Sequence, residues 1–294
     1  MQFPIIQLLL NSLIIGSIYA LVAVGFSIIY QTNRFMHFAH GGAVVASAYL
    51  AFLFFSILKI PFFISVILTI ASSCILGLIM YKLIYEPLRK KKSSNIIMLI
   101  ASFGILMLVE NIILLSFGSD MKSISYVKTQ QGINIFGATI TSLQIFIIII
   151  TVIILVITYW FMNKTNIGRN LRAVADNKEL ADIIGLNSNF YISLSFIIGS
   201  VLAAIAGILI GLEQYLSPTI GTNLMIKGFS GAVIGGVTSV PASIVGSYII
   251  GFAENFGVWF VPSGFKDAIT FILLLIFLLF KPSGLFGVDR GGRK

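Results

Sequence analysis

Residues 145–211 hold two long apolar runs, IFIIIITVIILVITYWF (145–161) and FYISLSFIIGSVLAAIAGILIG (190–211), on either side of the charged island GRNLRAVADNKELADIIGLN (168–187). An α-helix needs about 20 mostly apolar residues to cross roughly 30 Å of hydrocarbon. The two runs therefore predict membrane-spanning helices. The island predicts a loop at the membrane surface that joins them.

The whole chain has the composition that these runs suggest. Hydrophobic residues make up 58% of it and charged residues only 10%, whereas soluble domains carry about 25% charged residues. The short alternating segments of a transmembrane β-barrel are absent from the sequence. We expect an all-α, polytopic integral membrane protein that forms a single transmembrane domain over 1–294, with about eight or nine transmembrane helices. The expected spans are 5–30, 41–58, 62–84, 95–117, 140–162, 190–213, one or two within 224–259, and 266–281.

The basic residues predict how the chain sits in the membrane. Of 19 Lys and Arg residues, thirteen fall within 82–92, 163–178 and 281–294. Such clusters mark cytoplasmic loops next to a lipid bilayer, and this distribution argues against nucleic acid as a partner. We therefore expect the N-terminus outside and the C-terminus in the cytoplasm. An even number of crossings must then separate 187 from 281.

The region 224–259 is apolar but interrupted by Gly235, Gly236 and Pro241. Interrupted apolar segments are typical of broken helices that line a cavity, because unpaired backbone groups are tolerated only away from lipid. Two short crossings and a re-entrant pair both satisfy the required parity.

Small residues recur at a spacing of four along several expected spans, which favours close helix packing in lipid. The faces are Ser12, Gly16 and Ala20; Gly199, Ala203, Gly207 and Gly211; Gly228, Ala232 and Gly236; and Ser243, Ser247 and Gly251.

Both histidines, His37 and His40, lie in RFMHFAHGG, between the first two spans. Two ligands do not complete a zinc site, and no nearby Cys, Asp or Glu adds to them, so we expect no metal. A polar helix-turn at the membrane edge fits better. The following Gly41 and Gly42 suit a close approach of the backbone to a neighbour or a solute.

Glu110 lies with Asn111 deep inside an apolar run, and Glu254 with Asn255 lies near the end of another. An ionisable group within a span is a functional hypothesis by default. Glu110 could line a water-filled path or pair with a backbone or amide group.

The chain contains no set of nucleophile, base and acid, and no G-x-x-x-x-G-K-[ST] phosphate loop. It is therefore not expected to be an enzyme or to hydrolyse ATP itself.

The island 168–187 predicts a short helix. Asp176 and Glu179 have the spacing of a capping box, and Gly185 is a natural helix stop. Leu180, Ala181 and Ile184 then form an apolar ridge, and Leu171, Val174 and Ala175 form a second one. An amphipathic loop lying on lipid headgroups would explain Arg169 and Arg172 but not the carboxylates, whereas a protein-docking surface accounts for both.

Four stretches resemble one family of permeases. GSIYALVAVGFSIIYQTNRFMHFAHGG (16–42), the island 168–187, LSPTIGTNLMIKGFSGAVIGGVTSVPASIVGSYIIGFAE (216–254) and FKDAITFILLLIFLLFKPSGLFG (265–287) are similar to the permeases of branched-chain amino-acid ABC transporters. The resemblance is closer to the shorter leucine/isoleucine/valine type, and urea and short-chain amide permeases are also similar. His37 stands where the family usually has Asn, and Thr238 and Ala242 stand where it usually has Gly.

The resemblance implies an importer in a bacterial-type inner membrane that works by alternating access. Its partners would be a second homologous permease, in an expected heterodimer, two ABC ATPase subunits and an extracytoplasmic solute-binding protein. This chain would bind no cofactor, and ATP and Mg would be held by the ATPases. The docking loop would be 163–189, with Arg169, Arg172, Asp176, Glu179, Leu180, Ala181, Ile184 and Gly185. The translocation path would involve His37, His40, Gly41, Gly42, Glu110, Gly235 and Gly236. A self-sufficient secondary transporter or channel and an intramembrane enzyme are the alternatives.

Overall fold

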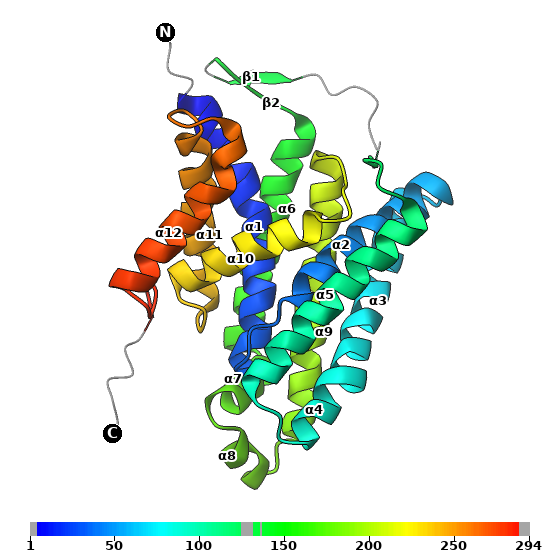
Figure 1. Ribbon diagram of the computed structural model, residues 1–294, viewed down its shortest axis with the longest axis vertical. Coiled ribbons are helices and arrows are strands. Elements are labelled where there is room, and N and C mark those ends of the chain that lie inside the picture. Colours follow the sequence, from blue (N-terminus) through cyan, green and yellow to red (C-terminus); the bar gives the residue numbers. More distant parts are fainter. Residues whose placement is uncertain (1–4, 125–131, 136, 288–294) are drawn as a thin grey trace.

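Helix α1 (Ile5–Asn33) runs through the centre of a helical bundle (Figure 1). The computed structural model describes residues 5–124, 132–135 and 137–287. Over residues 16–29 every side chain of α1 is buried. A helix that is apolar on all sides is stable only when it is surrounded, and neighbouring helices cover α1 on its several faces.

The other elements follow α1 in chain order, and most of them are helices. They are α2 (Ala39–Phe52), the π-helix η1 (Leu53–Ile57), α3 (Phe62–Ile79), the π-helix η2 (Met80–Tyr85), α4 (Glu86–Lys90), α5 (Asn95–Phe117), β1 (Ile133–Ile135), β2 (Ala138–Ile140), α6 (Ser142–Lys164), α7 (Asn166–Asp176), α8 (Lys178–Ile183), α9 (Ser188–Glu213), α10 (Ile220–Gly235), α11 (Val240–Gly257), the 3₁₀ turn η3 (Ser263–Phe265) and α12 (Lys266–Phe280).

Small residues bring α1 and α11 into close contact, as their spacing predicts. A methyl group at Gly251 would lie 2.9 Å from the Cα of Gly16 and 2.9 Å from the carbonyl oxygen of Ser12. Gly207 on α9 meets α2 even more closely, because a methyl group there would lie 2.4 Å from the Val44 oxygen. Close backbone approach gives the dispersion contacts that hold helices together in lipid, so these faces specify the bundle.

The interrupted segment forms a bent pair, α10 and α11, whose axes differ by 119° across a break of four residues. Gly236 ends α10 with φ of +126°, a conformation that side chains with a Cβ rarely adopt. The expected broken segment near 224–259 is confirmed, although α10 begins at Ile220, four residues before the expected start.

Seven of the described helices are long and apolar enough to cross a membrane, or up to eight if the bent pair counts as one span. The all-α polytopic class is therefore confirmed, at the lower end of the expected eight or nine. The described residues also contain a short antiparallel hairpin that the sequence reading did not anticipate. Its strands β1 and β2 pair Ile133 with Ile140.

The outer helices leave large apolar surfaces uncovered. Within the window that could span the membrane, only 11% of residues are buried for Ser263–Phe280 and 22% for Phe62–Lys90. Exposed side chains on these two segments include Phe280 and Leu83. Lipid or another protein chain must cover such surfaces.

The segments with the basic clusters gather at one end of the molecule. In Figure 1, α4, α7 and α8 lie together at the bottom, and α1 begins near the top. The clusters at 82–92 and 163–178 therefore face the same side of any membrane that the bundle spans. This is the arrangement that the positive-inside pattern requires.

Candidate functional site

The charged island folds as two short helices, α7 and α8, between α6 and α9. Three side chains cap the successive helix starts: the Thr165 hydroxyl accepts from the Gly168 N–H at 3.0 Å, Asn177 Oδ1 from Leu180 at 3.0 Å, and Asn187 Oδ1 from Phe190 at 3.1 Å. Each such cap typically stabilises a helix by about 1 kcal/mol. The island is therefore an ordered platform.

The expected capping box at Asp176 and Glu179 is wrong by one residue. Asp176 is the last residue of α7, and Asn177 occupies the cap position of α8. Asn caps a helix as well as Asp does, so the sequence offered two neighbouring cap residues, Asp176 and Asn177, and the D-x-x-E spacing favoured the wrong one. The expected stop at Gly185 is confirmed. Gly185 has φ of +88°, and the hydrogen bonds from Gly185 N to Asp182 O and from Leu186 N to Ala181 O form a Schellman motif.

The inner side of the platform is fixed by buried apolar residues. Leu171 and Val174 of α7 are almost fully buried, and so is Ala181 of α8, at 2% exposure. Ala181 therefore does not contribute to an exposed ridge, contrary to the expectation. Its small side chain lets α8 pack closely on the rest of the protein.

The outer side of the platform carries an exposed apolar ridge. Leu180 is 58% exposed, Ile183 79% and Ile184 67%. The expected ridge included Ala181 and not Ile183, whereas in the structure Ile183 is exposed and Ala181 is buried. We call Leu180, Ile183 and Ile184 the α8 ridge. Large aliphatic side chains grouped in this way on a polar loop are typical of a protein contact.

Polar contacts surround the α8 ridge. Arg172 donates to the Asn163 Oδ1 at 3.1 Å, and Arg169 donates to Asn166. The Ser188 N–H donates to Asp182 at 3.1 Å and so ties α8 to the start of α9. Hydrogen bonding from the Ser188 hydroxyl and backbone N–H lowers the pKa of Asp182. Arg172 thus joins α7 to the end of α6, whereas the Arg169 bond lies within α7.

The two histidines are buried inside the bundle, at 2% and 1% exposure. His37 Nδ1 lies 2.9 Å from the Tyr85 hydroxyl, within a cluster of aromatic rings that includes Phe196. His40 packs against Gly25, where a methyl group would lie 2.6 Å from the imidazole. In the described part of the chain, no three His, Cys, Asp or Glu side chains group as metal ligands. Both histidines make packing contacts, and their path-lining role stays a prediction.

Gly41 and Glu110 both contact the N-terminal part of α10. A methyl group at Gly41 would lie 2.6 Å from the Gly221 oxygen. Glu110 Oε1 accepts from the Thr222 N–H at 3.1 Å and from its hydroxyl at 2.7 Å. A carboxylate at a helix N-terminus pairs with orphan N–H groups and with the positive end of the helix dipole. Of the two roles considered for Glu110, the structure shows the pairing with a backbone amide.

Gly42 and Gly235 differ in how tightly they are enclosed. A methyl group at Gly42 would meet Val109 at an ordinary 3.5 Å, whereas one at Gly235 would lie 1.8 Å from the Ala242 oxygen. Gly235 also accepts a hydrogen bond from Phe286 N at 3.0 Å, so the segment after α12 is joined to the bend. Gly235 and Gly236 therefore lie at the bend between α10 and α11, where the two helices approach each other closely.

A buried ion-pair cluster, which the sequence reading largely missed, joins four helices. Lys227 Nζ lies 3.2 Å from Glu254 Oε1 and 3.1 Å from Asp267 Oδ1. The Tyr19 hydroxyl donates to Glu254 Oε2 at 2.8 Å, and Thr270 also donates to this carboxylate. Glu254 is only 2% exposed, so burial here is matched by full pairing.

The cluster forms the floor of a cavity of about 220 Å3, which we call the ion-pair cavity. Gln214, Asn223 and Lys266 also line it. The sequence analysis identifies Glu254 as an ionisable group within a span, but it does not identify Lys227. The available signal was a single Lys in the apolar run LMIKGFSGAVIG, because an unpaired cation there requires a carboxylate partner.

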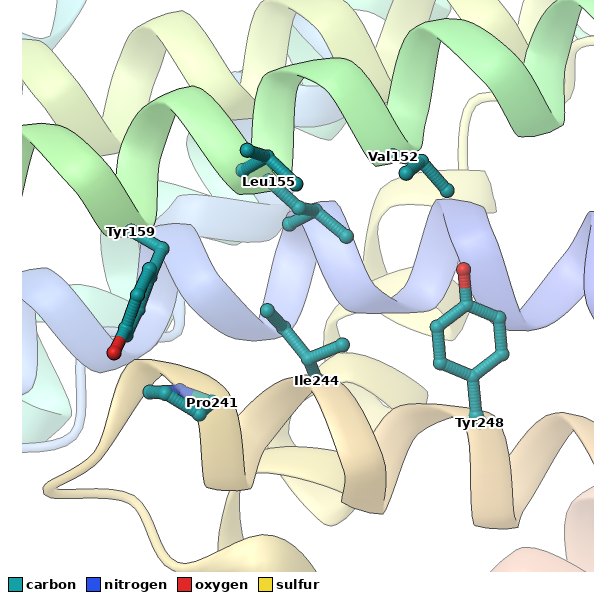
Figure 2. Close-up of a pocket in the computed structure, with 7 residues that line it drawn as sticks. Val152, Leu155, Tyr159, Pro241, Ile244 and Tyr248 are labelled. Atoms are coloured by element: carbon teal, nitrogen blue, oxygen red, sulfur yellow. The ribbon is translucent and has the colours of Figure 1, made fainter.

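An apolar groove of about 370 Å3 lies between α6 and α11 (Figure 2). Val152, Leu155 and Tyr159 border it on α6, and Pro241, Ile244 and Tyr248 border it on α11. The Tyr248 hydroxyl lies 2.9 Å from the Ser17 hydroxyl of α1. The groove offers apolar contacts alone along most of its length, which suits an acyl chain or a neighbouring helix better than a polar solute.

Comparison with known proteins gives a consistent result over nearly the whole chain. The family described as "Branched-chain amino acid transport system / permease component" matches residues 8–278. The chain is 33% identical to the high-affinity branched-chain amino acid transport system permease protein BraD of Pseudomonas aeruginosa, over 96% of this chain and 95% of the relative. It is 29% identical to the corresponding protein LivH of Escherichia coli K12, over 96% and 95%.

A solved structure shares the fold. The chain is similar to a chain of PsaBC from Streptococcus pneumoniae in complex with Fab, with a TM-score of 0.52 and 17% identity over 97% of this chain and 95% of the other. At this identity the likeness concerns the arrangement of helices only. The same arrangement of helices therefore occurs in an experimentally determined structure.

Proposed function

Because the chain belongs to the family of permease components of branched-chain amino acid transport systems, we propose that it is a permease subunit of an ABC importer for branched-chain amino acids. It would form the translocation path together with a second, homologous permease. Partner ATPase subunits would bind ATP and Mg and supply the energy. An extracytoplasmic solute-binding protein would deliver the amino acid.

The observation that carries the proposal is the α8 ridge on its braced platform. Leu180, Ile183 and Ile184 are exposed, while the other side of α7 and α8 is buried against the bundle. A lever must present a contact surface to the ATPase and must be rigidly joined to the helices that move. The three helix caps and the Ser188–Asp182 hydrogen bond supply that rigidity.

The proposed cycle follows from this arrangement. Closure of the ATPase subunits on ATP would push the platform, and α6 and α9 would transmit the movement to the bundle as near-rigid rods. A branched aliphatic solute favours an apolar path that binds it weakly. The expected path residues His37, His40, Gly41, Gly42, Glu110, Gly235 and Gly236 remain candidates for residues whose contacts change during this movement.

The proposed orientation places α4, α7 and α8 in the cytoplasm and the start of α1 outside. It is supported by the basic residues that these segments bring to one end of the molecule. The α6–α11 groove and the uncovered face of α12 are the apolar surfaces at which a second permease could pack. We propose a heterodimer with a homologous permease.

The coupling role is tested by placing charge on the α8 ridge. The double variant Leu180→Asp and Ile183→Asp would lose association with the ATPase subunits, because burying two carboxylates in an apolar contact is strongly unfavourable. We expect co-purification of the ATPases from detergent to fall at least about tenfold, with the amount of permease in the membrane unchanged. The matched control is Asp120→Asn, a change of an exposed carboxylate outside the island, which should retain the ATPases.

The transported solute is tested separately. The intact transporter, reconstituted in liposomes with its binding protein, should take up radiolabelled leucine in an ATP-dependent manner and leave urea outside. Uptake of urea or a short-chain amide instead would keep the ABC permease assignment and overturn the solute. Transport without any ATPase subunit would favour a secondary transporter or channel and overturn the proposal as a whole.

A further inference from the structure

A second charged cavity, of about 350 Å3, lies where three of the membrane-spanning segments end or begin. Asn33 is the last residue of α1, Arg89 lies near the end of the Phe62–Lys90 span, and Asn95 is the first residue of α5. Lys178 of α8 closes the cavity from the side of the island. It therefore lies at the depth at which a bilayer changes from hydrocarbon to headgroups.

The lining of this cavity is strongly cationic, and we call it the cationic cavity. Arg34, Arg89, Lys92 and Lys178 line it, together with one carboxylate, Asp176. The lining thus carries three more positive than negative charges. The ion pairs found among the described residues involve Lys90, Lys122 and Lys227, and none of them uses these four cations.

Two of the cations are held in place by neutral oxygen atoms. Arg89 donates to Asn33 Oδ1 at 2.6 Å, and Arg34 donates to the Ala175 carbonyl at 2.5 Å. The Asn33 side chain is itself fixed by its bond to the Ile29 carbonyl at 2.9 Å. A guanidinium has five N–H donors in a planar fork. Each arginine is therefore positioned while most of its donors are left for another acceptor.

The cations also disfavour one another. Burial, followed by the nearby positive charge of Arg89, lowers the pKa of Lys178, and Asp182 only partly opposes this. Four cations gathered beside α1, α4 and α8, with one carboxylate in the same lining, raise the free energy of the folded protein by their mutual repulsion. A bound anion with several acceptor oxygens would remove this repulsion.

We propose that the cationic cavity binds a phosphate group, carried by an anionic phospholipid headgroup or by a small phosphate compound. Arg guanidinium groups match phosphate oxygens in bidentate geometry, and Lys adds a mobile point charge. Basic pockets between transmembrane helices at the cytoplasmic surface are typical binding places for anionic headgroups. Ile96 and Ile97, 68% and 47% exposed beside Asn95, offer an apolar surface along which acyl chains can lie. The inference does not depend on the transported solute.

The experiment uses the full chain purified in a neutral detergent and follows thermal unfolding by tryptophan fluorescence. Dioctanoyl phosphatidylglycerol, dioctanoyl phosphatidylcholine and inorganic phosphate are titrated separately, because a ligand that binds the folded state raises the melting temperature. We expect a saturable rise with phosphatidylglycerol and little with phosphatidylcholine. In the variant Arg89→Gln with Lys178→Gln, half-saturation should need at least about tenfold more phosphatidylglycerol.

The control is Lys164→Gln, which removes one positive charge from the end of α6, outside the cavity, and should stay within about twofold of the wild type. Lys178→Gln alone serves if the double variant does not fold, since the Lys178 ammonium makes no hydrogen bond among the described residues; about a threefold weakening is expected. A rise with inorganic phosphate that the variant lacks would identify a small phosphate compound as ligand, and a rise with phosphatidylglycerol alone would identify a lipid.

Three results would overturn the assignment. The first is an equal response to phosphatidylcholine, and the second is an equal weakening in Lys164→Gln. The third is a double variant that responds to phosphatidylglycerol as the wild type does but no longer retains the ATPase subunits, which would mean that the cavity receives a carboxylate from the partner protein.

Discussion

The two charged cavities of this protein contain the same kinds of side chain in opposite balance. In the ion-pair cavity, Lys227 is shared between the carboxylates of Glu254 and Asp267. In the cationic cavity, four cations and one carboxylate line the wall, and Arg34 and Arg89 donate hydrogen bonds to neutral oxygens. The first cavity lies among α1, α10, α11 and α12, and the second lies where spans end beside the island.

The difference shows what each cavity is built to do. A buried ion pair whose hydrogen bonds are complete holds its helices in one arrangement, and losing either partner leaves a charge in a poor solvent. A cationic group without matching carboxylates adds little to stability by itself, but it is ready for an anion. We therefore interpret the ion-pair cluster as a structural lock of the bundle and the cationic cavity as a binding site.

The largest expected effect is that of breaking the lock. Glu254→Ala removes the main partner of Lys227 and the acceptor of the Tyr19 hydroxyl, so we expect a loss of about 3–5 kcal/mol in the free energy of unfolding. The measurement is denaturant or thermal unfolding in a neutral detergent. The matched control is Asp267→Asn, because Asp267 is 61% exposed and its loss should matter far less. Similar losses in the two variants would contradict the interpretation of a lock centred on Glu254.

A smaller effect is expected from one hydrogen bond of the same cluster. Tyr19→Phe removes the 2.8 Å bond to Glu254 and keeps the ring on which Lys227 rests, 5.5 Å from its centroid. Hydrogen bonds to charged groups contribute about 1.5–3 kcal/mol. The free energy of unfolding should therefore decrease by an amount in that range. Tyr248→Phe is the control, since its partner is the neutral Ser17 hydroxyl. If Tyr248→Phe destabilises the protein more than Tyr19→Phe, the carboxylate is not the centre of the network.

Much of the fold was predictable because membrane spans depend on length and apolar composition. The two runs around the island gave α6 and α9 to within about two residues, and Gly235 with Gly236 indicated the bend. The spacing of four identified Gly16 and Gly251 as packing residues, but it did not predict that these two glycines face each other. The start of α10 was missed because hydropathy alone does not detect a helix whose first turn is polar and follows a proline.

The sites were less predictable, because burial and pairing depend on helices that are distant in the sequence. The helical spacing correctly predicted Leu180 and Ile184 as exposed ridge residues. It did not predict which way the short helix α8 faces, and the structure buries Ala181 and exposes Ile183. Lys227 and Glu254 are 27 residues apart and meet only because α10 and α11 fold back at the bend. The cationic cavity brings together α1, α4, α5, α7 and α8, an arrangement that no local pattern in the sequence indicates.

Acid should loosen the attachment of α8, whose Lys178 lines the cationic cavity, to the start of α9. The pKa of Asp182 is lowered by its bonds to Ser188, so its contribution to stability is complete above its unfolded pKa of about 3.9 and is lost as the pH falls through the folded pKa. We expect proteolytic cleavage within 163–187 to accelerate as the pH falls below about 4. Asp182→Asn should be cleaved faster at neutral pH and depend less on pH. The same acid sensitivity in Asp182→Asn as in the wild type would exclude this carboxylate as the cause.

The smallest effect is expected for Lys178→Gln, and it should be opposite in sign to the loss of stability in Glu254→Ala. Lys178→Gln removes one of the mutually repelling cations, so in neutral detergent without anionic lipid the free energy of unfolding should stay level or rise by less than about 1 kcal/mol, because solvent screens the partly exposed ammonium. Lys227→Gln, the matched change in the ion-pair cavity, should be clearly destabilising, because it leaves Glu254 without its cation. Unfolding of the two variants side by side measures the contrast directly. If both lose stability equally, Lys178 is part of a structural network, and the distinction between a structural ion-pair cluster and an anion-binding site does not hold.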